Sequence, residues 1–212
     1  MNEHIRWHEE VVLQKTAAAL ENNLFNVHRA PTTADAVREI LSIIKEGETV
    51  GYGGSQTLKD MKIIESLTGR KQPVIEQKAG MSPAESIEIR RRSLLADVFM
   101  ASPNAVTKDG KLFFVDKIGN RAAGVMFGPK KVIVVAGRNK IVEDEKAADI
   151  RVRTMAAPAN AHRLGLKTPC AVTGTCADCA SPQRICNIAV TLRKRPAYTE
   201  FHVMLVDENL GY

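Results

Sequence analysis

The residues best suited to chemistry are four cysteines near the end of the chain, which has no other cysteine. They are Cys170, Cys176, Cys179 and Cys186, with the spacing C-x5-C-x2-C-x6-C. Two thiolates separated by two residues can bind one metal centre from a tight turn. Gly174 and Pro182 suit the bent backbone that would direct the outer two thiolates inward. The spacing therefore predicts a metal-binding segment over residues 168–188.

Four thiolates satisfy either a tetrahedral zinc ion or a 4Fe-4S cluster. Structural zinc sites usually combine two separated C-x2-C pairs, whereas this motif has one pair flanked by single cysteines. We therefore expect an iron-sulfur cluster (4Fe-4S), with zinc as the alternative and redox-active or free thiols as a third interpretation. Lys167 and Arg184 could offset the thiolate charge, or could be surface charges only.

A glycine loop follows the first predicted strand, residues 49–52, and contains Gly53, Gly54, Ser55 and Thr57. Free N–H groups at the start of a helix bind anions, and open α/β sheets bind ligands where their strands end. The loop matches neither the P-loop nor the dinucleotide fingerprint. A plain turn with Ser55 as the helix N-cap explains the same residues without a ligand.

Two further polar loops follow predicted strands. Asn120 and Arg121 come after the strand that ends at Asp116, and Asn139 and Lys140 come after the strand 131–136. Amide and basic side chains in such positions could bind a carboxylate or a phosphate. The alternatives are a surface arginine on a helix for the first loop and a polar strand exit for the second.

The elements that must position these residues alternate between helix and strand. Periodicity and capping predict helices at 3–22, 34–45 (capped by Thr33), 55–68, 83–95, 143–155 and 158–165. Apolar and β-branched runs predict strands at 49–52, 73–77, 98–101, 105–107, 111–116, 131–136 and 201–206. We expect one α/β domain, residues 1–212, with a three-layer, largely parallel sheet and a cysteine-rich insertion before the last strand. The strand 131–136 is apolar throughout, which predicts a central position.

Composition narrows the classes of partner. The net charge of +6 suits a small anionic metabolite, whereas aromatic residues make up only 5% of the chain, which argues against nucleic acid. No stretch approaches the length of a membrane span and the first ten residues are polar, so we expect a cytoplasmic protein that uses no membrane. Reduced thiols in that compartment favour metal ligation over disulfides.

The chain resembles the LUD-domain (lactate-utilisation) family of bacterial proteins from about Trp7 to Val206. The stretches that carry the resemblance are Gly53–Thr57, Ser102–Val106, Gly119–Arg121 and Val132–Val142, in this order. The resemblance implies a fold like that of ribose-phosphate isomerase and the CoA transferases. The simplest members lack residues 169–187, so the sequence is similar to a branch with an additional four-cysteine motif.

The resemblance and the motifs together lead to two expected functions. The first is an iron-sulfur redox enzyme or enzyme component that acts on a small carboxylate such as a hydroxy acid, together with other redox subunits. The second is a non-catalytic metabolite-binding or assembly subunit with a structural zinc site. A third, acyl or phosphosugar chemistry by analogy to the fold, would need a carboxylate such as Glu76, Glu85 or Asp116. The sequence is also compatible with a homo-oligomer.

Overall fold

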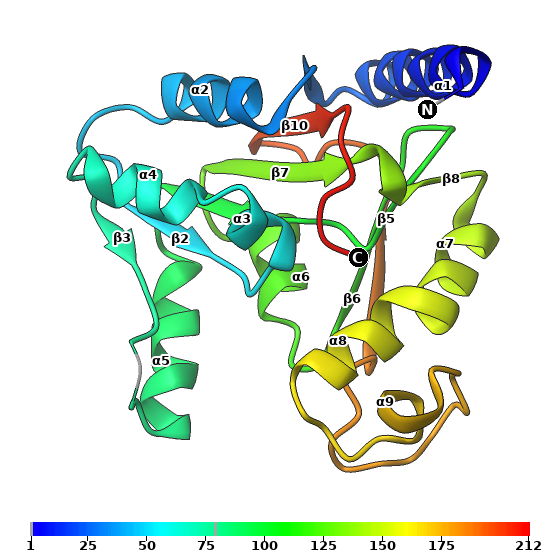
Figure 1. The fold of residues 1–212 in the computed structure, drawn as a ribbon. Helices are drawn as coiled ribbons and strands as arrows, with labels where there is room; N and C mark the ends of the chain where they lie inside the picture. Colours follow the sequence, from blue (N-terminus) through cyan, green and yellow to red (C-terminus); the bar gives the residue numbers. More distant parts are fainter. Residues whose placement is uncertain (1, 79) are drawn as a thin grey trace.

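The fold is built on a six-stranded, fully parallel sheet with the strand order β1-β10-β7-β4-β2-β3 (Figure 1). The computed structural model describes residues 2–78 and 80–212. The strands are β1 (Asn26–Ala30), β2 (Val50–Tyr52), β3 (Val74–Ile75), β4 (Val98–Ala101), β7 (Lys131–Gly137) and β10 (Glu200–Val206). Because all pairs are parallel, the loops that follow these strands meet at one edge of the sheet.

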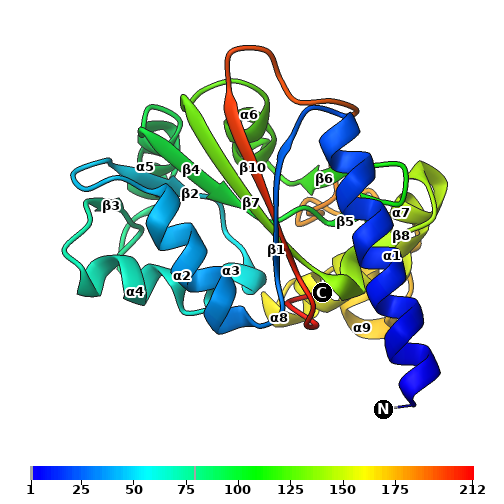
Figure 2. The same ribbon diagram turned by 90° about the horizontal axis from the view of Figure 1, so that it is seen from above.

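Helices cover both faces of this sheet, as the view from above shows (Figure 2). One face packs against α1 (Glu3–Asn22) and α6 (Asn120–Met126), and the other against α2 (Thr33–Ile43), α3 (Gln56–Asp60) and α4 (Ile63–Gly69). Along β7, Val132 and Val134 join the first apolar cluster, whereas Ile133 and Val135 join the second. The central position and two-sided burial expected for this strand are confirmed.

A second, smaller sheet lies beside the first and has the order β8-β5-β6-β9. Its strands are β5 (Ala105–Thr107), β6 (Leu112–Asp116), β8 (Ile141–Val142) and β9 (Ile188–Leu192). The expected hairpin of β5 and β6 is confirmed as an antiparallel pair. Neither β8 nor β9 was predicted: β8 has only two residues, whereas the sequence of β9, IAVTL, is apolar and β-branched and was a usable strand signal.

Several helix boundaries differ from the sequence prediction. Thr32, not Thr33, is the N-cap of α2, and its side chain accepts from Asp35 N. The helix expected over 55–68 is broken at Lys62, which has a φ of 51°. The capping box of α5 (Pro83–Ser93) is confirmed. The strand β1 was missed because its burial is partial and its residues are mostly polar.

The two helices expected at 143–155 and 158–165 form one continuous rod. It consists of α7 (Glu145–Arg151), the π-helical turn η2 (Val152–Ala156) and α8 (Ala157–Arg163). Pro158 has no N–H to donate, which normally ends a helix. The wider turn immediately before it lets the chain continue past the proline.

The cysteine segment is mainly irregular and begins with the short helix α9 (Pro169–Thr173), which packs against α8 (Figure 1). It leads into β9 on the edge of the smaller sheet. Among residues 2–78 and 80–212, no helix has the length and apolar content that crossing a membrane would require.

Candidate functional site

A cleft of about 480 Å³ opens at the edge where the parallel strands end. Polar residues from the loops after β2, β4, β6 and β7 line it, together with the π-helical turn, α8 and part of the cysteine segment. The polar side chains of this lining include Ser55, Thr57, Ser102, Asn104, Asp116, Asn120, Arg121, Lys140, Asn160, Arg163 and Cys186. The structure thus brings the three predicted anion-binding loops to one site.

Lys140 forms the floor of this cleft. A short 3₁₀ turn, η1 (Arg138–Lys140), directs its side chain inward, so that only 3% of the residue is exposed. Its Nζ atom donates to Thr57 Oγ1 and Ser102 Oγ, each at 2.8 Å, and to the carbonyl of Pro103 at 3.2 Å. All three acceptors are neutral oxygens, so no carboxylate of the described residues contacts this amine.

The environment of Lys140 disfavours its charged form. Burial, together with the charges of Arg151 and Arg121, lowers the pKa of this amine to about 7, against an opposite effect of Asp60. Burial also lowers the pKa of the Arg151 guanidinium. Arg151 donates to the carbonyls of Asn104 and Asn139 and, among the described residues, has no carboxylate partner. The cleft floor therefore carries positive charge that an anion could balance.

Arg121 is fixed beside Lys140 by the loop that ends β6. Its Nε atom donates to Asp116 Oδ1 at 2.7 Å, and the other oxygen of Asp116 accepts from the backbone N–H of Ala122 at 2.8 Å. Arg121 Nη1 also reaches the carbonyl of Ser102 at 3.3 Å. Since Lys140 contacts the side chain of the same serine, both basic side chains hydrogen-bond to Ser102.

The glycine loop leaves space for the side chain of Arg121 and is followed by Thr57, which contacts Lys140. A Cβ atom on Gly53 would lie 2.2 Å from Cγ of Arg121, so only glycine leaves room for that side chain, whereas a Cβ on Gly54 would meet nothing within 4 Å. Ser55 is the N-cap of α3 and accepts from Leu58 N, which confirms its capping role. Thr57, two residues further along the chain, is buried and contacts Lys140.

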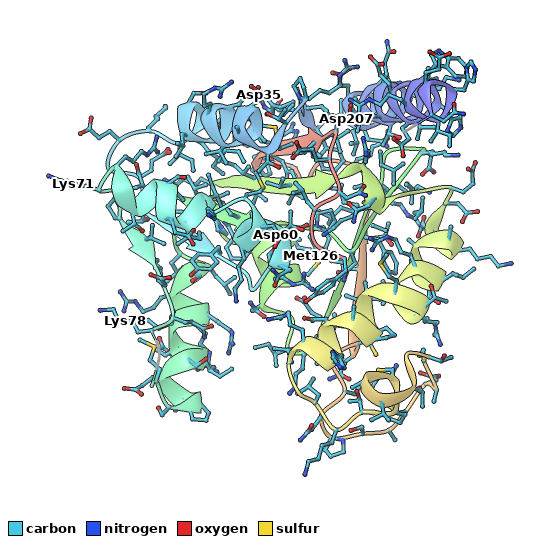
Figure 3. All side chains as sticks on the ribbon, viewed as in Figure 1. Asp35, Asp60, Lys71, Lys78, Met126 and Asp207 are labelled. Atoms are coloured by element: carbon cyan, nitrogen blue, oxygen red, sulfur yellow. The ribbon has the colours of Figure 1, made fainter. Side chains whose placement is uncertain are left out.

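The two asparagines among the predicted site residues have different positions. Asn120 lines the cleft at the start of α6. Asn139 is directed away from the cleft: its side chain accepts from Leu210 N at 3.0 Å and donates to the carbonyl of Gly211 at 3.2 Å. It therefore holds the C-terminal residues, which Asp60 of α3 also contacts through Gly211 N (Asp60 is labelled in Figure 3).

Basic side chains also surround the mouth of the cleft. Arg90, Lys117 and Arg163 line it together with Arg121 and Lys140, whereas Asp116 is the single acidic side chain among the described lining residues. Arg163 donates to Asn160 Oδ1 at 2.8 Å, which leaves its charge without a carboxylate in the part of the chain that the structure describes. The cleft as a whole suits an anionic ligand.

The cysteine segment is held together by Arg184. Its guanidinium donates to the carbonyls of Cys179 at 2.8 Å and Cys186 at 3.2 Å, and it pairs with Asp178 at 2.9 Å. All four cysteines are free thiols of intermediate exposure. Burial raises the pKa of Cys186, and the charges of Cys176 and Cys179 add to this effect, whereas Arg184 opposes it.

Within residues 2–78 and 80–212, the side chains of His, Cys, Asp and Glu do not form a group of three or more arranged to hold a metal ion. The four sulfurs thus share one segment without forming a ligand set, and the metal centre that their spacing indicates stays a prediction. Cys186 nevertheless lines the cleft, so the segment borders the predicted anion site.

Three residues of the site were not identified from the sequence as candidates: Ser102, Asn104 and Arg151. Ser102 and Asn104 follow the fully buried strand β4, so their position after an apolar strand was a usable signal. Arg151 carries a weaker signal, a basic residue on the helix face that buries Ala148 and Val152. The sequence suggests Asp116 only as a possible catalytic carboxylate. In the structure its two oxygens accept from Arg121 and from the backbone of α6, which positions both.

Comparison with known families identifies the chain. The sequence pattern of the family described as LUD domain matches residues 13–206. The chain belongs to the LUD-domain family. The glycine loop, Arg121 and Lys140 all lie within the matched part of this LUD domain, as do the four cysteines.

A crystal structure of a DUF162 family protein from Deinococcus radiodurans has a similar fold, with a TM-score of 0.54 and 11% sequence identity. The similarity covers 93% of this LUD domain and 98% of that chain. At this identity the comparison shows the fold alone. No curated protein sequence matches the chain.

Proposed function

We propose that this LUD domain binds a small carboxylate metabolite, such as a hydroxy acid, in the cleft at the edge of the sheet. The observation that carries the proposal is the buried Lys140, which contacts only neutral oxygens and shares Ser102 as a hydrogen-bond partner with Arg121. A carboxylate in this cleft would balance the positive charge and accept hydrogen bonds from charged donors.

We further propose that the domain is a redox component, in which the cysteine segment holds a 4Fe-4S cluster beside the bound metabolite. Four free thiols within one segment would supply the donor set, and Cys186 borders the cleft. When bound, the cluster would supply electron transfer to or from the metabolite. The protein residues would bind and orient the carboxylate, and Arg184 would offset the thiolate charge. Other redox subunits would be the electron partners.

A second function is favoured by one specific observation. Asp116 is the single acidic side chain among the described residues that line the cleft, and it is engaged by Arg121 and Ala122 N. A cleft with no free carboxylate base suits a non-catalytic binding or assembly subunit, in which zinc would hold the cysteine segment together.

The carboxylate site is tested by calorimetric titration with lactate and with propane-1,2-diol, which has the same carbon skeleton but no charge. We expect lactate to bind and the diol not to bind. Equal binding of the two compounds, or binding of neither, would contradict the proposal.

The metal is tested on protein purified without air, by metal analysis and visible absorption. A brown protein that contains iron and sulfide is expected, and Cys176→Ser should lose both. A colourless protein with one zinc ion per chain would instead support the second function. A chain that contains neither metal would rule out both assignments for the cysteines while leaving the carboxylate site to its own test.

A further inference from the structure

We propose that Lys140 acts as a nucleophile that forms an imine with a 2-oxo acid bound in the cleft. This inference rests on the carboxylate site proposed above and adds both a substrate class and a covalent step to it. The residues that carry it are Lys140, its two hydroxyl neighbours Thr57 and Ser102, and Arg121.

The first requirement of such a nucleophile is a neutral amine. The hydrogen bonds of Lys140 Nζ go to two hydroxyls and one backbone carbonyl. A hydroxyl can donate or accept, so the same contacts satisfy the amine with either two or three protons. A carboxylate in the same position would hold the ammonium form, and none contacts Nζ among the described residues.

Most of the charge around Lys140 also favours the neutral amine, although Asp60 opposes this effect. Arg151 and Arg121 both disfavour a third positive charge at this depth, and the pKa of Lys140 is lowered to about 7. A lysine with an ordinary pKa near 10.4 is almost entirely protonated at neutral pH. Here a large fraction of the amine carries a free electron pair, which is the condition for attack on a carbonyl carbon.

The second requirement is a substrate held with its carbonyl at the amine. Arg121 donates to the backbone carbonyl of Ser102, and Lys140 donates to the hydroxyl of the same residue. The guanidinium and the amine therefore contact the same residue. In a 2-oxo acid the carboxylate and the carbonyl are on adjacent carbon atoms. Binding of the carboxylate by Arg121 would therefore bring the carbonyl carbon toward Nζ.

The step needs no reactant other than one proton from solvent. The electron pair of Nζ attacks C2, the C=O π electrons move to oxygen, and a proton passes from nitrogen to that oxygen to give a carbinolamine. Ser102 and Thr57 contact both Nζ and each other, at 3.1 Å, and can carry this proton. The hydroxyl then takes a second proton, supplied by solvent, and leaves as water as the nitrogen electron pair forms the C=N bond of an iminium. Its electron withdrawal makes the C3 protons acidic.

The test is reductive trapping. The protein is incubated with pyruvate and cyanoborohydride at neutral pH, and intact mass and peptide mapping follow. We expect one adduct per chain, with the mass of pyruvate minus one oxygen atom, located at Lys140. Its yield should rise with pH with a midpoint near about 7. Lys140→Arg should abolish the adduct, whereas Lys59→Arg, at an exposed lysine of α3, should not.

Trapping spread over surface lysines, or located at any other single lysine, would overturn the inference. Because the site is mapped on the unmodified chain, the result stands even if Lys140→Arg does not fold. Titration with lactate, which has no 2-oxo group, tests the carboxylate site separately from imine formation. Binding of lactate and pyruvate without an adduct would overturn only the imine, and absence of any binding would overturn the carboxylate site and the imine together.

Discussion

The Nζ atom of Lys140 lies 2.8 Å from Oγ1 of Thr57, a residue on the helix that follows the glycine loop. The two residues come from loops after different strands, β7 and β2, and both are buried. Their contact ties the predicted anion loops into one site at the edge of the sheet. It also places an ionisable amine where water cannot fully solvate it.

Replacement of Lys140 by methionine should make the protein more stable at low pH. The folded-state pKa of Lys140 is lowered, so the unfolded chain binds more protons, and wild-type stability should rise with pH from about 7 toward 10.4. The slope cannot exceed about 1.4 kcal/mol per pH unit for one group. Methionine keeps the volume but has no charge, so Lys140→Met should lack this slope.

Urea unfolding at about pH 6 and about pH 9 checks this prediction. The same variant should bind lactate at least about tenfold more weakly, because a charged donor is lost. A variant less stable than wild type at the lower pH would contradict the lowered pKa. Lys59→Met, at an exposed position, is the control and should keep the wild-type pH dependence.

Gly53→Ala should impair carboxylate binding, whereas Gly54→Ala should not. The added Cβ at position 53 would lie 2.2 Å from Cγ of Arg121, so the arginine must move, but at position 54 it meets nothing within 4 Å. We expect about a tenfold loss of lactate affinity for Gly53→Ala and a stability loss of about 1 to 3 kcal/mol. Calorimetry and urea unfolding of both variants provide the comparison, and equal effects would contradict the role of Gly53.

The sheet could be predicted from the sequence because its central strands are strongly patterned. β4 and the residues of β7 after Lys131 are apolar. The capping box of α5 is formed by residues close together in the sequence, so it could be predicted without knowledge of the fold. β9 (IAVTL) is also apolar and β-branched, but it follows the cysteine segment directly, where an irregular insertion was expected up to the last strand. The continuous rod of α7, η2 and α8 was missed because a proline normally signals a break.

The site was predictable in its parts but not in its assembly. Polar residues after strands indicated the glycine loop, Arg121 and Lys140, since parallel strands end at a common edge. The depth of Lys140 could not be foreseen, because it depends on the 3₁₀ turn and on Ser102 and Thr57 from two other loops. Asn139 has the same sequence context as Lys140 but faces the C-terminal residues instead.

Asp116→Asn should destabilise the protein and loosen Arg121. Asp116 is 4% exposed and accepts from both Arg121 and the backbone of α6. Loss of its charge leaves the partly buried guanidinium of Arg121 without its partner. In comparable sites this lowers the free energy of unfolding by about 3 kcal/mol or more. Urea unfolding measures this loss. The control is Asp149→Asn, because Asp149 pairs with Arg153 on the surface, and it should cost less than about 1 kcal/mol.

Away from the cleft, His28 in the middle of β1 and His202 near the start of β10 belong to one chain of contacting side chains. His28 Nε2 lies 2.9 Å from His202 Nδ1, and their outer nitrogens contact Glu39 and Glu200. Burial lowers the pKa of His202, and the charges of His28 and Lys131 lower it further, although Glu200 opposes this.

The sign of the resulting pH dependence follows from His202. The unfolded chain takes up a proton near the ordinary pKa of about 6.5, whereas the folded chain does so only at lower pH, so stability should fall as the pH drops below about 6.5. This window is separate from that of Lys140, which lies above 7. His202→Gln should flatten the acid slope and leave the alkaline one unchanged, because His202 has no contact with the cleft. Urea unfolding from about pH 5 to about pH 9 measures both slopes, and an acid slope that persists in His202→Gln would assign it to another group.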